Sequence, residues 1–282
     1  METKPLISLS TAVVCYNSPS LELKKLLTSL LDSIEQLKQS FELSSIPIYL
    51  IDNSDESSLE VDLLSVVDEE RCKFLSVEPR LVQGQGNVGY GSAHNLVISE
   101  LDSHFHLLLN PDVILQKETL MVGINFLLES PKVVLASPHA VDEKGDKQYL
   151  CKRYPSVLTL LIRGSSLNFL KKIFRSLLAV YEMQNLSEIE PSIDVPMASG
   201  CFMLTRTNNL KEIDGFDERY FLYFEDFDLS LRLGKKGKIA YLPAMHIEHS
   251  GGGAGNKGMG HFKMFARSGI RFFNTYGWHF IR

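Results

Sequence analysis

Apolar segments that suit strands alternate with segments of helical periodicity over the first third of the chain, and this order constrains the fold most. Such alternation predicts an α/β fold with a Rossmann-like, mostly parallel sheet flanked by helices. Ligands of such sheets bind at the carboxyl ends of the strands, so the residues after each strand are the first site candidates. The expected strands are Leu9–Cys15, Ile46–Ile51, Lys73–Val77 and His106–Leu109, and the expected helices are Leu21–Leu37, Leu59–Val67 and Ser92–Leu101.

Polar residues follow three of these strands directly. Tyr16 and Asn17 follow the first, the stretch from Asp52 to Asp55 follows the second, and Asn110 to Asp112 follows the strand at His106–Leu109. Asn, Asp and Pro are also ordinary turn formers, so any one of these loops has a purely structural explanation. Three in succession predict a polar edge at the carboxyl ends of the strands.

Composition excludes several classes of protein. With 282 residues and 44% hydrophobic content, the chain suits one large domain or two closely joined halves. A net charge of −5 argues against a nucleic-acid partner. The chain has no uninterrupted apolar run of about eighteen residues, so no membrane span is expected, and the apolar N-terminal run reads as a strand. Four widely spaced cysteines indicate buried free thiols in a reducing compartment.

Three carboxylates lie in an unusually apolar segment, Phe221–Leu233. In a helix starting near Phe224, Asp228 would pair with Arg232 at i,i+4, and acids in the first turn would complement the helix dipole. The preceding aromatic residues would shield that turn from water. A shielded carboxylate has a raised pKa or a cationic partner, so Glu225 and Asp226 are both candidates for a general base.

The glycine-rich loop and two histidines near the end of the chain are weaker indications of a site when each is taken alone. Gly84–Asn95 is a glycine-rich loop leading into a helix, where backbone amides can approach a ligand. His246 and His249 follow an expected strand at Ile239–Leu242, and a lone histidine there is more often structural than a ligand. Further elements expected in this half are a helix at Lys117–Leu128, a strand at Val133–Ser137, a tight turn at Asp142–Asp146 and an interrupted strand at Val195–Thr205.

Seven short motifs in a fixed order carry a resemblance. They are VVCYN, LIDNSDESS, GNVGYGSAHN, LLLNPDV, ASGCFMLTR, GFDERYFLYFEDFDLSLR and HIEHSGGG, spread from about Leu6 to Gly255. Together they resemble the inverting family-two glycosyltransferases of GT-A fold, and among these the rhamnosyltransferase-like group. The resemblance implies one GT-A domain, with a nucleotide-sugar half at 1–115, an acceptor and catalytic half at 116–255, and a C-terminal helical extension at 256–282.

The implied reaction is transfer of a sugar from a nucleotide diphosphate sugar to a hydroxyl of a glycan or lipid-linked saccharide. dTDP-rhamnose is the favoured donor, and the implied setting is cell-surface polysaccharide synthesis, such as that of O-antigen, on the cytoplasmic side of the membrane. The residues implied in nucleotide-sugar binding are Tyr16, Asn17, Asp52, Asn53, Asn87, Gly89, Tyr90, Asn95, Asn110 and Asp112.

By the same resemblance, Asp226 is the catalytic base with Glu225 beside it, and Gly200, Tyr223 and Glu225 lie on the acceptor side. Asp112 and His249 would hold a divalent cation, Mg²⁺ or Mn²⁺. Asn110 stands where the first aspartate of the metal motif often stands. Fewer anionic ligands imply weaker metal binding.

Two basic and apolar stretches, Arg153–Tyr181 and the closing segment 261–282, fit either core-packing amphipathic helices or a face that touches anionic lipid. The first stretch carries Arg163, Lys171, Lys172 and Arg175 among its apolar residues. Oligomeric state, acceptor and linkage are left open by the sequence.

Other activities compete with this interpretation. A UDP-sugar transferase of the same fold would share most of the motifs. A non-catalytic nucleotide-sugar-binding module would have no use for Asp226. A sugar nucleotidyltransferase should carry a glycine-rich segment with an arginine after the first strand, where this chain has YNSPSLELK. A nucleotide-sugar hydrolase is the last alternative.

Overall fold

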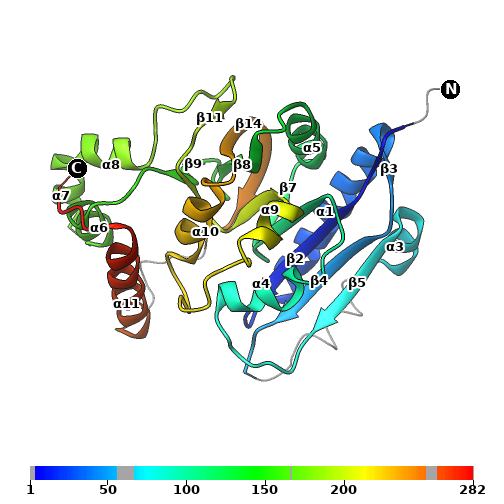
Figure 1. The fold of residues 1–282 in the computed structure, drawn as a ribbon, viewed down its shortest axis with the longest axis horizontal. Coiled ribbons are helices and arrows are strands. Elements are labelled where there is room, and N and C mark those ends of the chain that lie inside the picture. The colour runs from blue at the N-terminus through cyan, green and yellow to red at the C-terminus, as the bar shows by residue number, and fades with distance from the viewer. Residues whose placement is uncertain (1–3, 56–66, 166, 252–258, 282) are drawn as a thin grey trace.

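The computed structural model describes residues 4–55, 67–165, 167–251 and 259–281. Within them a single large sheet of mixed direction runs through the molecule, with helices on both sides (Figure 1). The strands of its main path, in spatial order, are β11 (Ser192–Ile193), β14 (Lys238–His249), β8 (Val133–Val141), β13 (Phe202–Arg206), β6 (Phe105–Leu109), β2 (Leu9–Cys15), β4 (Ile46–Asp52) and β5 (Val77–Val82). The α/β fold expected from the sequence is confirmed.

The N-terminal half of the sheet is parallel. β2 pairs with β4 and with β6, and β4 pairs with β5, all in parallel register. Every residue of β2 and β6 is buried, which explains their continuous apolar sequences. Opposed pairs such as Cys15 with Asp52 and Val13 with Leu109 bring the carboxyl ends of these strands to one edge.

The C-terminal half has mixed directions. β13 runs antiparallel to both β6 and β8, whereas β14 runs parallel to β8. The short strand β7 (Val113–Leu115) pairs antiparallel with β14, so that His249 lies opposite Val113. β14 is longer than the expected strand Ile239–Leu242 and carries both His246 and His249.

One expected strand is wrong. Lys73 lies in helix α3 (Glu69–Leu75), and the strand here is β5. The Asp68 side chain caps α3 by accepting a hydrogen bond from the Arg71 amide at 2.9 Å. The helix expected at Leu59–Val67 falls almost wholly outside the described residues.

The remaining expected elements are close to their predicted places. The interrupted strand at Val195–Thr205 forms β12 (Met197–Ala198) and β13, with a break between them. The turn at Asp142–Asp146 is closed by a hydrogen bond from the Asp142 amide to the Asp146 carbonyl. The helices of this part of the chain are α1 (Ser20–Ser40), α4 (Tyr90–Ile98), α5 (Thr119–Glu129), α9 (Thr207–Glu212) and α10 (Glu225–Leu233).

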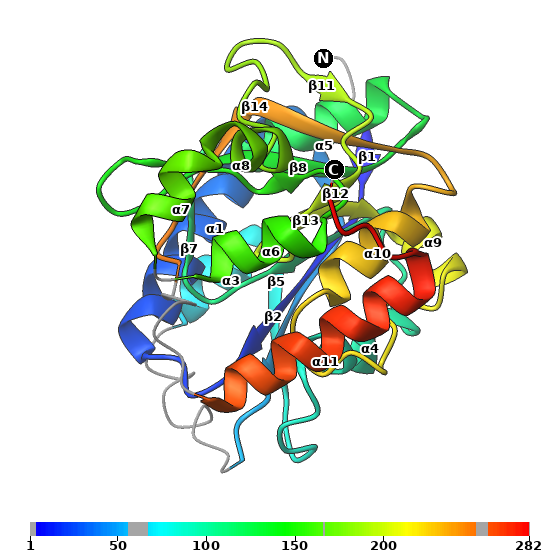
Figure 2. The same cartoon turned by 90° about the vertical axis from the view of Figure 1, so that its left-hand side faces the viewer.

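A group of helices gathers at the end of the molecule opposite β5 and α3 (Figures 1 and 2). It comprises α6 (Val157–Gly164), α7 (Asn168–Ile173), α8 (Arg175–Tyr181) and α11 (Met259–Tyr276), so the expected C-terminal helical extension is confirmed. Phe272 and Phe273 of α11 pack with Phe224 and Tyr220, which fixes this group beside the start of α10. The boundaries proposed for the two halves of the domain stay a prediction.

Two expectations from composition can be compared with the structure. Cys15, Cys72, Cys151 and Cys201 are all buried and free, as expected. Within the described ranges, no helix combines the length and apolar character that crossing a membrane requires.

Candidate active site

The polar residues after β4 form a closed hydrogen-bond network with the glycine-rich loop. The side-chain nitrogen of Asn53 donates to the side-chain oxygen of Asn87 at 3.1 Å. The side-chain oxygen of Asn53 accepts from the backbone amide of Val88 at 3.0 Å. The same Asn87 oxygen accepts from Gly89, and Gln85 donates to the Asp52 carbonyl. Loops that are 34 residues apart in sequence are therefore held as one unit.

The first loop joins this unit through its backbone. The Asn17 amide donates to the Ser54 hydroxyl at 2.9 Å, and Asn17 adopts a positive φ of 47°. Tyr16 beside it is half exposed. A free aromatic face at the edge of buried polar groups suits stacking on a nucleotide base.

Asn95 has a structural explanation. Its amide nitrogen donates to the Phe216 carbonyl at 2.8 Å, and its oxygen accepts from the Phe216 amide at 2.8 Å. Both ends of the side chain thus hold the turn before α10 against α4. Its contact with the donor stays a prediction.

A chain of hydrogen bonds connects the glycine-rich loop with the acidic helix. The Tyr90 amide donates to the Phe221 carbonyl, and the Tyr90 hydroxyl donates to the Gly200 carbonyl at 2.7 Å. The Gly200 amide in turn donates to Oδ2 of Asp226 at 3.0 Å. Burial raises the pKa of Tyr90 well above its ordinary value, and the charges of Glu225, Asp226 and Asp112 raise it further. Three predicted acids therefore lie around one tyrosine.

The two neighbouring acids of α10 differ in what stabilises their charge. Asp226 accepts backbone hydrogen bonds from Gly200 and, at 2.9 Å, from Phe227. Glu225 is 5% exposed, and its Oε2 has no hydrogen-bond partner among the described residues. Burial raises the pKa of both, and the charge of Asp226 raises the pKa of Glu225 further. The backbone hydrogen bonds stabilise the charged form of Asp226, and Glu225 has no such partner at Oε2, a difference that the sequence pattern left open.

The turn that delivers these acids is strained. Tyr223 and Phe224 both adopt positive φ, 70° and 66°, although neither is glycine. Each such residue costs about 1–3 kcal/mol and persists only where its surroundings hold it. The aromatic cluster with α11 supplies that support. Asp228, by contrast, pairs with Arg232 at 2.7 Å and accepts from Tyr276, so its predicted structural role is confirmed.

Asp112 and His249 are brought together by the pairing of β7 with β14. His249 Nε2 lies 3.6 Å from Oδ2 of Asp112, and Oδ1 of Asp112 is buried without a hydrogen-bond partner among the described residues. Gln148 accepts from His249 Nδ1 at 2.7 Å and donates to the His249 carbonyl at 2.8 Å. Burial lowers the pKa of His249, while the charge of Asp112 acts in the opposite direction. Because Nδ1 is held by Gln148, Nε2 is the ring nitrogen that faces Asp112.

This pair fits a divalent cation as a partial site. A carboxylate with an unpaired oxygen and an oriented neutral imidazole are suitable ligands. In the described part of the chain, however, no group of three or more His, Cys, Asp or Glu side chains could hold a metal. Any cation here would need oxygen ligands from water or from a bound diphosphate. That agrees with the weak binding expected from Asn110.

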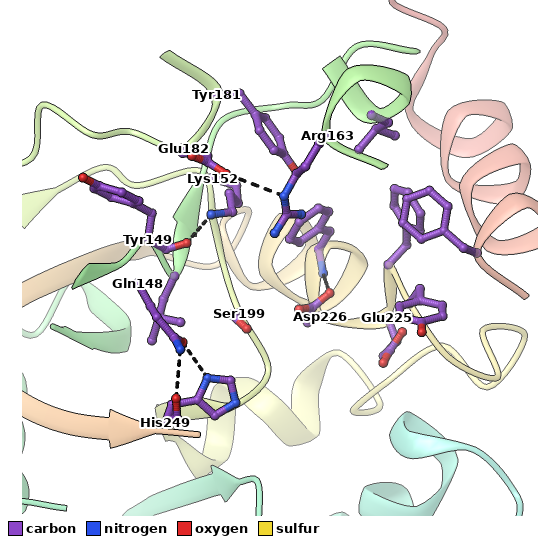
Figure 3. A pocket seen from close by; sticks show the side chains of 16 residues that line it. Gln148, Tyr149, Lys152, Arg163, Tyr181, Glu182, Ser199, Glu225, Asp226 and His249 are labelled. Carbon is purple, nitrogen blue, oxygen red and sulfur yellow. Dashed lines mark hydrogen bonds and ion pairs between the residues drawn. The ribbon is translucent and has the colours of Figure 1, made fainter. Parts of the chain in front are cut away.

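A cavity of about 430 Å³ lies between the acidic helix and the helical group (Figure 3). Glu225, Asp226, Tyr223 and His249 line it, as the sequence predicted for the acceptor and metal sides. Polar residues of the lining that the sequence analysis did not assign to the site include Gln148, Lys152, Arg163, Glu182 and Ser199. Gln148 is 101 positions from the histidine that it orients, so no local pattern could have identified it.

Comparison with known proteins supports the expected resemblance. No protein-family model matches the chain. Rhamnosyltransferase WbbL of Escherichia coli is 26% identical over 174 residues, 58% of this chain and 61% of that protein. An N-acetylglucosaminyl-diphospho-decaprenol L-rhamnosyltransferase of Mycobacterium tuberculosis is 28% identical over 184 residues, 60% of this chain and 58% of that protein. The chain thus matches about three fifths of the length of these relatives.

Solved structures show the fold. TarS of S. aureus, residues 1–349, aligns with 95% of this chain and 72% of its own, with a TM-score of 0.56 and 16% identity. The mannosyltransferase PcManGT of Pyrobaculum calidifontis, in complex with GDP-Man and Mn²⁺, aligns with 87% of this chain and 57% of its own, with a TM-score of 0.58 and 12% identity.

The chain has the GT-A glycosyltransferase fold. Its predicted resemblance to rhamnosyltransferases is confirmed by the curated relatives. The roles of the individual site residues stay predictions, for which the geometry above gives the physical grounds.

Proposed function

We propose that this protein is an inverting glycosyltransferase that moves a sugar from a nucleotide diphosphate sugar to an acceptor hydroxyl. One observation carries the proposal. Asp226, a carboxylate held by two backbone amides, lines a cavity beside a second buried acid, Glu225, whose Oε2 has no hydrogen-bond partner among the described residues. That is the arrangement a general base needs, because the charged form is stabilised while water is partly excluded.

The proposed donor is dTDP-rhamnose. The names of the two curated relatives, both rhamnosyltransferases, support it. In this proposal the network of Asp52, Asn53 and Asn87 holds the nucleotide at the carboxyl ends of β2 and β4, with Tyr16 against the base. A UDP-sugar donor is the alternative within the same fold.

The proposed acceptor is a saccharide joined to a lipid through a diphosphate. The name of the M. tuberculosis relative, which specifies a diphospho-decaprenol acceptor, supports this class. In the transfer step the acceptor O–H bond breaks and Asp226 receives the proton. The acceptor oxygen then forms its bond to the anomeric carbon as the bond to the diphosphate breaks on the opposite face. Gly200 and Phe227 keep donating to Asp226 and so fix its position.

We propose that Asp112 and His249 hold a Mg²⁺ or Mn²⁺ ion together with the donor. A bound divalent cation would offset the negative charge that develops on the leaving nucleoside diphosphate. Gln148 would keep Nε2 of His249 in position as a ligand. The Mn²⁺ reported with PcManGT supports this choice of metal.

We further propose that the protein works at the cytoplasmic face of a membrane. Four buried free thiols support a reducing compartment. Leu161, Phe169, Ile173 and Val180 are exposed on α6–α8, a large apolar area for a surface. Lys171, Lys172 and Arg175 belong to the same helices, and positive charge beside apolar side chains suits anionic lipid. Binding to vesicles with and without anionic lipid, at low salt, tests this contact.

A transfer assay tests the proposed function. Purified protein is first screened by thermal shift against dTDP-rhamnose, UDP-sugars and GDP-sugars, with and without Mn²⁺, because a true donor stabilises the folded state. Each donor that binds is then incubated with and without a diphosphate-linked saccharide, and products are identified by mass. Release of free sugar alone would indicate a hydrolase. Binding without turnover would indicate a non-catalytic module.

A further inference from the structure

The cavity beside Asp226 contains two cations that the proposed transfer step does not use. Lys152 lies on β10 (Cys151–Lys152) and Arg163 on α6, and both line the cavity (Figure 3). His249 lines the same cavity, whereas Asp112, its proposed partner in holding the donor's metal, is not among the lining residues.

Lys152 is a buried cation that has no carboxylate in direct contact among the described residues. It is 6% exposed, and its ammonium donates to the Tyr149 carbonyl. Among the described residues no carboxylate forms an ion pair with it. The Tyr181 ring at 5.9 Å gives weak additional support. Burial lowers the pKa of Lys152 to about 8 and the charge of Arg163 lowers it further, while the charges of Glu182 and Asp226 across the cavity oppose this shift. Keeping such a charge out of water is unfavourable unless an anion binds beside it.

Arg163 is only loosely engaged. Its Nε lies 3.6 Å from Oε1 of Glu182, longer than a hydrogen bond, and its side chain is half exposed. Glu182 also accepts from Gln184, so part of its charge is stabilised elsewhere. A guanidinium that can turn from such a partner offers paired N–H donors, the geometry that phosphate oxygens match.

The position of the two cations indicates which phosphate they would meet. Arg163 lies on the same helix as Leu161, whose side chain is exposed on the face proposed to contact lipid. An anion held by Lys152 and Arg163 would lie in the cavity that Asp226 also lines, next to the helical group proposed to contact lipid. The donor's diphosphate, by contrast, is expected beside Asp112 and His249.

We propose that Lys152 and Arg163 form a binding site for a phosphate group of the acceptor, the group that joins the acceptor sugar to its carrier. The inference rests on the proposed function, because it assigns part of the acceptor in that reaction. The site would orient the acceptor sugar by its phosphate while Asp226 meets the hydroxyl. A sugar acceptor without phosphate would lose this orientation and bind weakly.

Two acceptors and two pairs of variants test the proposal. One acceptor carries the sugar through a diphosphate to a short alkyl chain, and the other carries the same sugar directly on that chain. The variants are Lys152→Gln and Arg163→Gln. Lys211→Gln is the control for Lys152→Gln, because Lys211 also donates to a backbone carbonyl. Arg80→Gln is the control for Arg163→Gln, because Arg80 is also ion-paired and its side chain is as exposed as that of Arg163. Neither control residue lines the cavity.

Each cavity variant should raise the KM for the diphosphate acceptor roughly 10- to 100-fold, the usual effect of losing a charged hydrogen bond. The KM for the alkyl glycoside and the dissociation constant of the donor should not change, and the controls should behave as wild type. Equal losses with both acceptors would overturn the proposal. So would a weaker donor affinity, because the cations would then serve the donor diphosphate.

A binding measurement separates this inference from the proposed function. Inorganic pyrophosphate is titrated into wild-type protein and both cavity variants by calorimetry without divalent metal. Weaker binding in both variants supports the site even if wild-type protein transfers no sugar, a result that would count against the proposed function alone. Unchanged binding would overturn the site. If Lys152→Gln fails to fold, the half-exposed Arg163 carries the test.

Discussion

The proposed nucleotide edge, formed by the loops after β2 and β4 and the glycine-rich loop, differs from the proposed catalytic cavity beside Asp226 in how far its polar groups are satisfied. At the nucleotide edge, Asn53 and Asn87 use their side chains to close hydrogen bonds between two loops. In the cavity, Glu225 and Lys152 are buried without an ionic partner among the described residues, and Tyr223 and Phe224 have strained backbones.

The difference teaches what each region is built to do. A closed network holds a shape before a ligand arrives and so reduces the ordering that binding requires. Buried charges without partners are unfavourable until a substrate or a proton is present, and they are common at sites of chemistry. We therefore expect changes at the edge to alter stability and donor affinity, and changes in the cavity to alter turnover.

The largest effect is expected from Asp226→Asn. The amide keeps the size of the side chain but cannot accept the acceptor's proton, so turnover should fall by about two to four orders of magnitude. Donor affinity should stay near that of wild type, since Asp226 lies on the cavity side. Initial rates and donor titration measure the two quantities. Near-normal turnover would remove Asp226 from the role of base.

Asp112→Ala should weaken donor binding only when metal is present. Loss of the one carboxylate of the partial metal site should reduce metal-dependent affinity by about 10- to 100-fold, the usual range for metal-site changes. Calorimetry with and without Mn²⁺ checks this, with Asp142→Ala in a surface turn as the control. An equal loss in the absence of metal would contradict the assignment.

Gly89→Ala tests the close contact between the glycine-rich loop and the backbone of the turn before α10. Gly89 has φ of 90°, and a Cβ there would lie 2.4 Å from the Phe221 carbonyl oxygen. Gly145 has a similar φ of 83° with nothing within 4 Å, so Gly145→Ala measures the cost of a side chain at positive φ without a close contact. That cost is about 1–2 kcal/mol, and the clash should add about 1–3 kcal/mol at Gly89. Denaturant unfolding of both variants measures the difference, and equal losses would show that the close approach is unimportant.

Asn53→Ala should destabilise the loops after β4 and before α4 by about 1–3 kcal/mol, because the part-buried Val88 amide loses its acceptor and the Asn87 oxygen keeps only its bond from Gly89. Donor affinity should fall while turnover at saturating donor changes little. Asn208→Ala, on an exposed position of α9, is the control for unfolding measurements. A loss confined to turnover would show that the edge and the cavity are not separate in function.

The smallest expected effect is on pH dependence. Burial raises the pKa of Asp226, so activity should fall as pH is lowered through a value above the ordinary aspartate range near 4. The charge of Arg163 lowers that pKa, so Arg163→Gln should move this acid limb to higher pH. The shift is measured from the pH dependence of kcat/KM for the wild type and for Arg163→Gln with the alkyl glycoside acceptor. A shift to lower pH would contradict the assignment.

Much of the nucleotide edge could be predicted because its residues follow single buried strands. Leu9–Cys15 and Ile46–Asp52 are continuous apolar segments, and the polar residues after them can only lie at one edge of a parallel sheet. The strand expected at Lys73–Val77 was wrong because Asp68 and the acids after it start a short helix. Local capping outweighed the apolar pattern there.

The cavity could be predicted only in part. The acidic turn was visible because its charges interrupt an aromatic run, but the choice of Asp226 over Glu225 depends on the Gly200 amide, 26 positions away. Arg163 was recognised only as one cation of the basic, apolar stretch Arg153–Tyr181, and Lys152, just before that stretch, was not singled out at all. Only the packing of α6 beside β10 and α10 brings them into one cavity.

The stereochemistry of the product tests the central claim most directly. Purified protein, donor, metal and diphosphate-linked acceptor are incubated together, and the anomeric configuration of the new linkage is determined by NMR. The account predicts a glycoside of configuration opposite to that of the donor, because Asp226 activates the acceptor on the face opposite the leaving diphosphate. A glycoside of retained configuration, or free sugar without any glycoside, would contradict it.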